Sequence, residues 1–139
     1  ITVGLGTDGT SSNNNLDMLE ECRLAAMLHK NMTGDPEIIP AAQALAMATS
    51  EGAKALGFTD VGKIEAGQKA DIVLYNMDKP YWHPRNDRTS LFVYAANAND
   101  ADTVLVNGKV LMQNGELLYI DLEKVYAEAD TRARRLTNK

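Results

Sequence analysis

The stretch ITVGLGTDG, residues 1–9, decides how this chain is interpreted. Val3 and Leu5 lie between glycines, a pattern typical of a β-strand buried on both faces of a sheet. Such a strand needs neighbours, so we expect its partner strands to lie outside these residues. Asp8 follows in a glycine-flanked turn, at the strand end where α/β enzymes assemble their active sites. Spacing alone favours an ordinary Asp-Gly turn.

Helical segments are expected after this turn. Polar residues that form turns and cap helices fill positions 7–15, and helical apolar spacing follows them. The predicted helices cover residues 16–30, capped by Asn14 or Asn15, 41–49, with Pro40 as first residue, and 50–56, ended by Gly57.

The pattern changes to that of strands after residue 57. The apolar run 72–75 predicts a buried strand, and Asn107-Gly108 predicts a type I′ hairpin between two β-rich runs. A second Asn-Gly pair, Asn114-Gly115, precedes a further predicted strand over 117–120. The last segment predicts an amphipathic helix with Asp121 as its cap. We therefore expect two parts, 1–57 and 58–139.

Composition narrows the classes of function. The 139 residues include 14 Lys+Arg and 19 Asp+Glu, for a formal net charge of -5, which disfavours a nucleic-acid or anionic-membrane surface. No run of apolar residues is long enough for a membrane helix, and no signal segment is recognisable, so we expect a cytoplasmic protein. Cys22 is the single cysteine and is interpreted as a buried, unreactive thiol.

Several motifs, taken in order, resemble those of metal-dependent amidohydrolases. The resemblance is to the branch of methylthioadenosine/S-adenosylhomocysteine deaminases and triazine chlorohydrolases, and it covers essentially the whole chain. The matching segments are Gly6-Thr7-Asp8-Gly9, Ser12-Asn13-Asn14, Leu16-Asp17-Met18, Ala48-Thr49, 52–57, 62–65, Gly67, 70–74, 91–95 and 104–109.

The resemblance implies an α/β fold. Residues 1–57 would be the last strand of a (β/α)₈ barrel and its following helices, and residues 58–139 would be part of a small β-sandwich with a closing C-terminal helix. Because such a barrel takes about 250 residues, the chain is interpreted as the C-terminal part of an enzyme. The family's remaining metal ligands and catalytic Glu would lie upstream, so we expect the chain alone to be inactive.

The resemblance also implies the site residues. Asp8 would be both metal ligand and catalytic proton carrier, while Ser12 and Asn13 match a polar loop that could contact substrate. A simple helix-capping turn is the alternative role for Ser12 and Asn13. Zinc is the expected ion and iron is compatible with one carboxylate ligand. Neither His29 nor His83 has the spacing of a metal site.

The implied activity is hydrolytic deamination of an adenine-type or other aminated heterocycle by metal-activated water. One alternative keeps the fold and changes the reaction, giving a chlorohydrolase or a deaminase for guanine, cytosine or a triazine. Another is a non-catalytic module that forms an oligomer. The expected partners are a small heterocyclic substrate and either the missing N-terminal barrel portion or a second copy of the chain.

Overall fold

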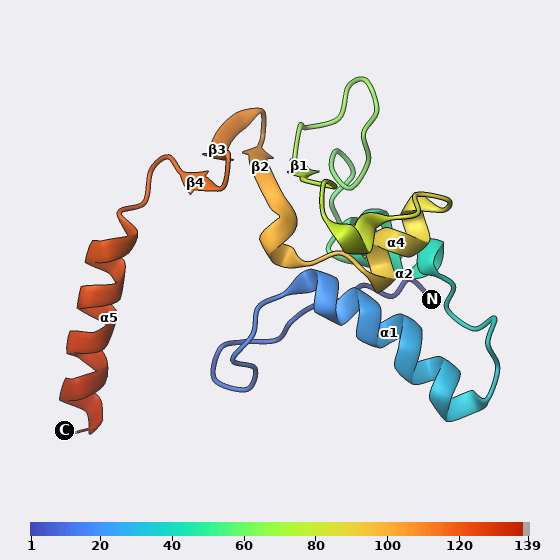
Figure 1. Cartoon of the computed structure of the whole chain (residues 1–139), viewed down its shortest axis with the longest axis horizontal. Coiled ribbons are helices and arrows are strands. Elements are labelled where there is room, and N and C mark those ends of the chain that lie inside the picture. The colour runs from blue at the N-terminus through green and yellow to red at the C-terminus, as the bar shows by residue number, and fades with distance from the viewer. Residues whose placement is uncertain (138–139) are drawn as a thin grey trace.

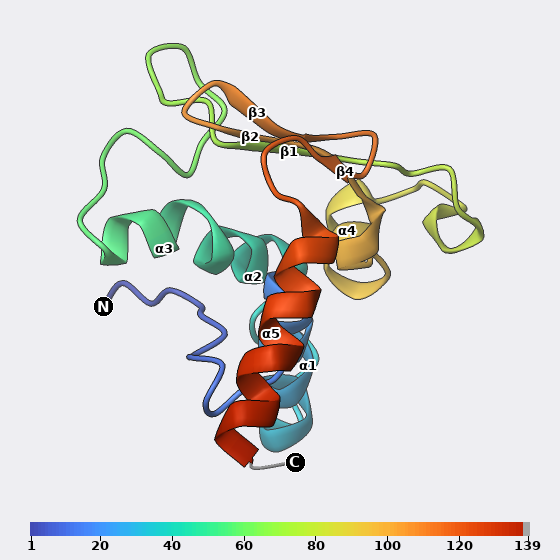
Figure 2. The same cartoon turned by 90° about the vertical axis from the view of Figure 1, so that its left-hand side faces the viewer.

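The computed structural model describes residues 1–137. Helices occupy one side of the molecule and an antiparallel sheet the other (Figure 1, Figure 2). The elements in chain order are α1 (Met18–Thr33), α2 (Ala41–Ala48), α3 (Ser50–Ala55), β1 (Ile72–Tyr75), the 3₁₀ helix η1 (Pro80–Trp82), α4 (Arg88–Tyr94), the 3₁₀ helix η2 (Ala98–Asp100), β2 (Ala101–Val106), β3 (Lys109–Gln113), β4 (Glu116–Leu117) and α5 (Leu122–Thr137).

The first predicted strand is not formed. Residues 1–6 are neither helix nor strand, and the Leu5 amide donates to the Met47 carbonyl at 3.1 Å. A strand requires a paired neighbour, and within residues 1–137 no strand lies beside this segment. The segment instead passes close to α3, where a Cβ added to Gly4 would stand 2.9 Å from the Gly52 Cα. Glycine is therefore required for the two backbones to approach at this point.

The helices after the turn are confirmed, with shifted ends and a different cap. α1 runs from Met18 to Thr33, because the Asp17 carboxylate accepts from the Leu19 and Glu20 amides. The prediction of Asn14 or Asn15 as cap was therefore wrong. Pro40 is the N-cap of α2 and not its first helical residue.

The core lies where α1, α2 and α4 meet. Its first cluster is made of small and medium side chains: Cys22, Ala26, Ala41, Ala44 and Val93. Cys22 is fully buried, which raises its thiol pKa and agrees with the expected unreactive thiol. Val93 comes from α4, so this core joins residues on both sides of position 57. The division into 1–57 and 58–139 stays a prediction.

A second cluster contains Leu19, Trp82 and Ala96 and lies beside a buried carboxylate. Asp100 is 3% exposed and accepts from the Trp82 Nε1 at 3.1 Å, from the Asn97 amide at 2.9 Å and from the Tyr81 hydroxyl. Partners from η1 and η2 thus satisfy the charge in place of water. The 3₁₀ turn η1 is held in place by this anchor.

The sheet has the strand order β1-β2-β3-β4, all pairs antiparallel. The hairpin at Asn107-Gly108 is confirmed, since both residues have positive φ, 49° and 77°. β4 covers only Glu116–Leu117, shorter than the predicted strand over 117–120. β1 is correctly placed but not buried, because Val73 and Leu74 are 40% and 53% exposed.

The predicted C-terminal helix is confirmed as α5. It begins after Asp121, whose carboxylate accepts from the Lys124 amide at 3.0 Å. Every residue of α5 is exposed, and the helix stands apart from the other elements in Figure 1. Within the described residues it therefore does not close the fold as expected. None of the helices in this part of the chain has the length and apolarity to cross a membrane.

Candidate active site

Asp8 lies in an exposed turn with an uncommon backbone conformation. Its φ is 59°, in the left-handed region that non-glycine residues rarely occupy. The Gly9 amide donates to Asp8 Oδ1 at 2.6 Å, and the Ser12 hydroxyl donates to Oδ2 at 2.9 Å. These hydrogen bonds, that of Gly9 first, lower the pKa of Asp8 below its ordinary value. The carboxylate is therefore ionised at neutral pH and held by its own loop.

The loop after Asp8 is closed by its backbone. The amides of Ser12 and Asn13 both donate to the Gly9 carbonyl, at 3.0 and 2.9 Å. This turn brings the Ser12 hydroxyl back to the Asp8 carboxylate across four positions of sequence. Ser12 therefore contacts the carboxylate of Asp8 directly, while its expected role toward the substrate stays a prediction.

Asn13 lies deeper and is partly buried. Its Nδ2 donates to the Thr7 carbonyl at 3.0 Å and to Glu21 Oε1 at 3.2 Å, while its Oδ1 accepts from the Asn15 amide at 3.1 Å. A side-chain amide has two N–H hydrogens, so both donors are engaged inside the protein. The substrate-binding role expected for Asn13 stays a prediction, and the visible contacts are those of a residue that holds the loop.

Glu21 is a member of this cluster that sequence reasoning missed. It lies in the first turn of α1, where an acidic residue is ordinarily explained by the helix dipole. Its carboxylate reaches the loop only because α1 folds back beside residues 7–13. The one signal available in the sequence was the pair of adjacent acidic residues, Glu20 and Glu21. In the structure, Glu21 accepts a hydrogen bond from Asn13 and Glu20 accepts one from Asn15.

The chemistry of Asp8 fits one ligand of a divalent metal ion. Carboxylate oxygens bind zinc and iron alike, and each Asp8 oxygen retains a lone pair beyond its one hydrogen bond. Over residues 1–137 no group of three or more His, Cys, Asp or Glu side chains could hold a metal. His29 contacts the Ala25 carbonyl, and His83 is exposed in a loop. Within residues 1–137 neither histidine belongs to a group of side chains that could hold a metal ion. A complete site needs ligands from other residues.

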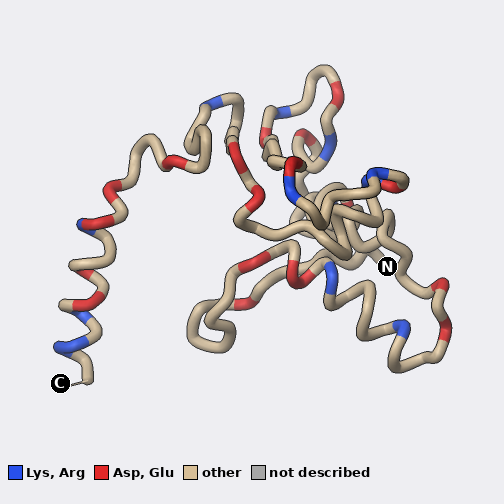
Figure 3. The backbone as a smooth tube through the Cα atoms, viewed as in Figure 1, with Lys and Arg blue, Asp and Glu red and all other residues tan. Residues whose placement is uncertain are grey.

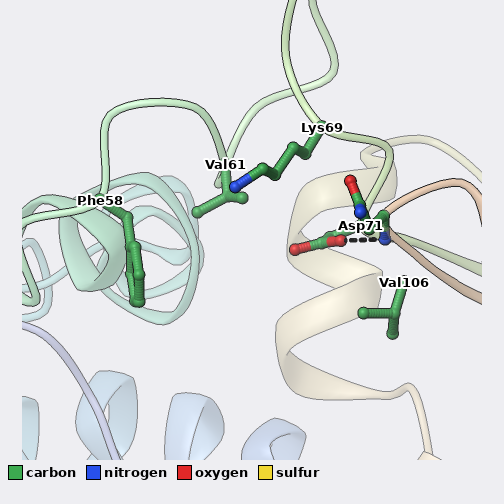
Figure 4. A pocket seen from close by; sticks show the side chains of 6 residues that line it. Phe58, Val61, Lys69, Asp71 and Val106 are labelled. Atoms are coloured by element: carbon green, nitrogen blue, oxygen red, sulfur yellow. Dashed lines mark hydrogen bonds between the residues drawn. The ribbon is translucent and has the colours of Figure 1, made fainter.

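An open hollow of about 270 Å³ lies elsewhere, lined by Phe58, Val61, Lys69, Asp71, Val106 and Asn107 (Figure 4). Its charged groups are already paired. Lys69 Nζ lies 2.8 Å from Asp60 Oδ2, and Asp71 Oδ1 accepts from the Asn107 amide at 2.6 Å. Both charged side chains that line the hollow thus have partners within the protein, and the Asp8 turn remains the candidate site.

Known proteins resemble this chain over most of its length. Residues 1–111 match the model of the amidohydrolase family. The chain belongs to the amidohydrolase family. The matched segment includes the Asp8 turn, α1 and the sheet as far as β3, so the match covers residues on both sides of position 57.

Curated relatives carry a specific activity in their names. The 5-methylthioadenosine/S-adenosylhomocysteine deaminase of Pelotomaculum thermopropionicum is 53% identical over 137 residues, which are 99% of this chain and 32% of the relative. That of Moorella thermoacetica is 52% identical over 136 residues, 97% of this chain and 32% of the relative. This amidohydrolase chain thus spans about a third of the length of the relatives it matches.

Solved structures share the fold of this amidohydrolase chain. An adenosine deaminase of Xanthomonas campestris with bound zinc superposes with a TM-score of 0.96 at 36% identity, over 100% of this chain and 32% of that one. An atrazine chlorohydrolase of Arthrobacter aurescens complexed with zinc superposes with a TM-score of 0.84 at 34% identity, over 94% of this chain and 29% of that one. The arrangement of helices and open sheet is therefore that of a corresponding part of larger enzymes.

Proposed function

We propose that this chain is the C-terminal third of a metal-dependent enzyme that hydrolytically deaminates an adenine-type or other aminated heterocycle. The observation that carries the proposal is the ionised Asp8 carboxylate, exposed at a left-handed turn and fixed by Gly9 and Ser12. Relatives named as deaminases, about half identical over nearly the whole chain, support it. Residues 1–6 would pair with strands of a (β/α)₈ barrel, which would supply the neighbours they lack here.

Asp8 would hold the divalent ion. When bound, such an ion lowers the pKa of a coordinated water toward neutrality. Deamination adds water to the ring carbon that bears the exocyclic amine and releases ammonia, so one proton must travel from the water to the leaving nitrogen. An ionised carboxylate beside that carbon can accept the proton and donate it again. The lowered pKa of Asp8 keeps it in the accepting form.

Zinc is the ion we assign to the site. Both solved relatives described above contain zinc. Iron stays compatible with a carboxylate ligand, because the identity of the ion depends on ligands beyond Asp8. Ser12 would support the same centre through its hydrogen bond to Asp8 Oδ2 and could also contact the substrate.

A chlorohydrolase is the second candidate. The likeness to the atrazine chlorohydrolase, with a TM-score of 0.84 and 34% identity, favours it specifically. The two reactions differ in the group displaced from the ring, whereas Asp8 would hold the metal ion and accept the proton of the water in both. Release of ammonia from methylthioadenosine, against release of chloride from a chlorotriazine, separates them directly.

The test of the proposal is Asp8→Asn in the full-length protein. Loss of the proton acceptor should lower kcat by roughly 10²- to 10⁴-fold. Bound zinc, measured by elemental analysis after gel filtration, should also fall. Asp35→Asn, in the exposed turn after α1, is the matched control and should change neither. Retention of both zinc and turnover by Asp8→Asn would refute the assignment. The 139-residue chain alone should release no ammonia.

A further inference from the structure

We propose that Glu21 is a positioning residue that holds Asp8 in its ligand geometry through the side chain of Asn13. The inference rests on the proposed function in one respect, the assignment of Asp8 as metal ligand. None of the comparisons assigns a role to Glu21. Two hydrogen bonds of the Asn13 side chain link the first turn of α1 to the peptide that precedes Asp8.

The first step is that Glu21 is itself fixed. It lies on α1 between the buried residues Leu19 and Cys22, which pack into the two core clusters. The Glu21 amide donates to the Asp17 carbonyl at 3.2 Å, so the residue belongs to a regular, capped helical turn. The packing of the core therefore fixes the position of the Glu21 backbone from which the carboxylate extends.

The second step is the bridge. Asn13 Nδ2 spans from Glu21 Oε1, at 3.2 Å, to the Thr7 carbonyl oxygen, at 3.0 Å. Two acceptors on the nitrogen side fix the orientation of the amide, because the flipped amide would place its oxygen against both of them. A carboxylate acceptor makes a stronger hydrogen bond than a neutral carbonyl does, so the contact to Glu21 is the stronger of the two. Without it, only the Thr7 carbonyl would hold this nitrogen.

The bridge holds the peptide that precedes Asp8. The Thr7 carbonyl belongs to the peptide plane that joins Thr7 to Asp8, and the Asp8 φ of 59° is the rotation next to that plane. A left-handed conformation costs a non-glycine residue about 1–2 kcal/mol, so surrounding contacts must maintain it. Gly9 and Ser12 hold the carboxylate, and the Glu21–Asn13 bridge holds the backbone on the other side.

Glu20 provides a matched control for the simpler explanation. If Glu21 served only the positive end of α1, its neighbour Glu20 would serve equally, since both lie in the first turn. The Glu20 carboxylate contacts the Asn15 side chain and not Asn13. Removing each carboxylate in turn therefore distinguishes the effect of the Glu21–Asn13 bridge from the effect of the helix dipole.

The experiment measures zinc affinity of the full-length protein by competition with a chelator, together with kcat and KM. Glu21→Ala should weaken zinc binding by about 10-fold, the low end for losing a residue behind a metal ligand, and lower kcat with KM within about twofold. Glu21→Gln should recover most of the affinity, because its amide oxygen still accepts from Asn13. Glu20→Ala should leave zinc affinity unchanged.

Asn13→Ala breaks the bridge from the loop side and leaves α1 intact. It should weaken zinc binding as much as Glu21→Ala, and the double variant should lose no more than either single one. If Glu21→Ala fails to fold, Asn13→Ala beside Glu20→Ala still decides the question.

Three results would overturn the inference: unchanged zinc affinity in Asn13→Ala, equal losses in Glu20→Ala and Glu21→Ala, or full additivity in the double variant. If Asp8→Asn itself keeps both its zinc and its turnover, the proposed function fails instead.

Discussion

α1 and α5 are both 16 residues long and both begin with an aspartate cap, yet they are packed very differently. α1 buries Leu19, Cys22, Ala25 and Ala26, whereas every residue of α5 is exposed within the described chain. Within the described chain, the stability of α5 is therefore local. Acidic residues gather toward its start and basic residues toward its end (Figure 3), which suits the helix dipole. Glu128 and Arg132 form an i,i+4 pair at 3.1 Å.

This difference shows what an apolar stripe can and cannot predict. The large apolar residues of α1 include Leu24, Met27 and Leu28, which are 40%, 52% and 52% exposed. The buried stripe is formed by smaller residues such as Cys22 and Ala26. Periodicity identifies a helix, but the partner decides which stripe is covered.

The largest effect is expected at the anchor of the second core cluster. Asp100→Ala would leave the Trp82 Nε1, the Asn97 amide and the Tyr81 hydroxyl without their acceptor, at a cost of at least about 3 kcal/mol. Asp102→Ala, on the half-exposed strand β2, should cost less than about 1 kcal/mol. Thermal unfolding of the full-length variants measures both. Equal losses would contradict the role of Asp100.

Protonating the same carboxyl should have a smaller effect than deleting it. Burial raises the pKa of Asp100, but the hydrogen bonds from Tyr81, Asn97 and Trp82 outweigh it and leave the pKa below its ordinary value. The stabilising contribution is therefore fully present above pH 4 and is lost as pH falls through the lowered pKa. Melting temperatures between pH 5 and pH 2 should fall less steeply for Asp100→Ala than for the unaltered protein. Parallel curves would contradict this.

The same substitution made in two helices tests packing directly. Val93→Ala, in the fully buried α4 position, should destabilise the protein by roughly 1–3 kcal/mol. Val125→Ala, at a residue of α5 that is 49% exposed, should fall within about 0.5 kcal/mol, since alanine is the better helix former. Chemical unfolding measures the difference. A cost above 1 kcal/mol at Val125 in the full-length protein would mean that another part of it covers α5.

The smallest effects are expected at the two caps. Asp17→Ala should cost about 1 kcal/mol of global stability, because α1 unfolds only with the core. Asp121→Ala removes a similar cap, but the loss should appear as fraying of α5 alone. Hydrogen exchange distinguishes the two variants. In Asp17→Ala the amides of the whole core should exchange faster, whereas in Asp121→Ala only the amides at the start of α5 should do so. Global change in both would contradict the separation.

Much of the fold follows from local chemistry. Asn107-Gly108 predicts its hairpin because both residues tolerate positive φ, and Asp121 predicts the start of α5 because a carboxylate can accept from the free amides there. The segment 1–6 fails as a strand because pairing is not a local property. β1 was expected to be buried from its composition, but a strand is buried only if something covers it, and Val73 and Leu74 remain exposed.

The candidate site divides in the same way. Asp8 was identified from its turn and from the resemblance of the surrounding motif, and its assignment as a ligand stays a prediction. The contact between Glu21 and Asn13 joins residues eight positions apart, with a turn and a helix start between them. No spacing rule places a first-turn glutamate against the preceding loop. Only the direction in which α1 leaves that loop brings the two together.

By itself, therefore, the sequence determined α1, α2, α3 and α5, the tight hairpin, the cap of α5 and the amidohydrolase motif, because each depends on backbone preferences and side chains within a few residues. The tertiary structure decided which face of α1 is buried, that α5 is exposed over the described chain, and that Glu21 reaches the loop of Asp8. These outcomes depend on the position of one element relative to another. That position is set by the packing of small side chains such as Ala26, Ala44 and Val93, which the pattern of a single segment does not contain.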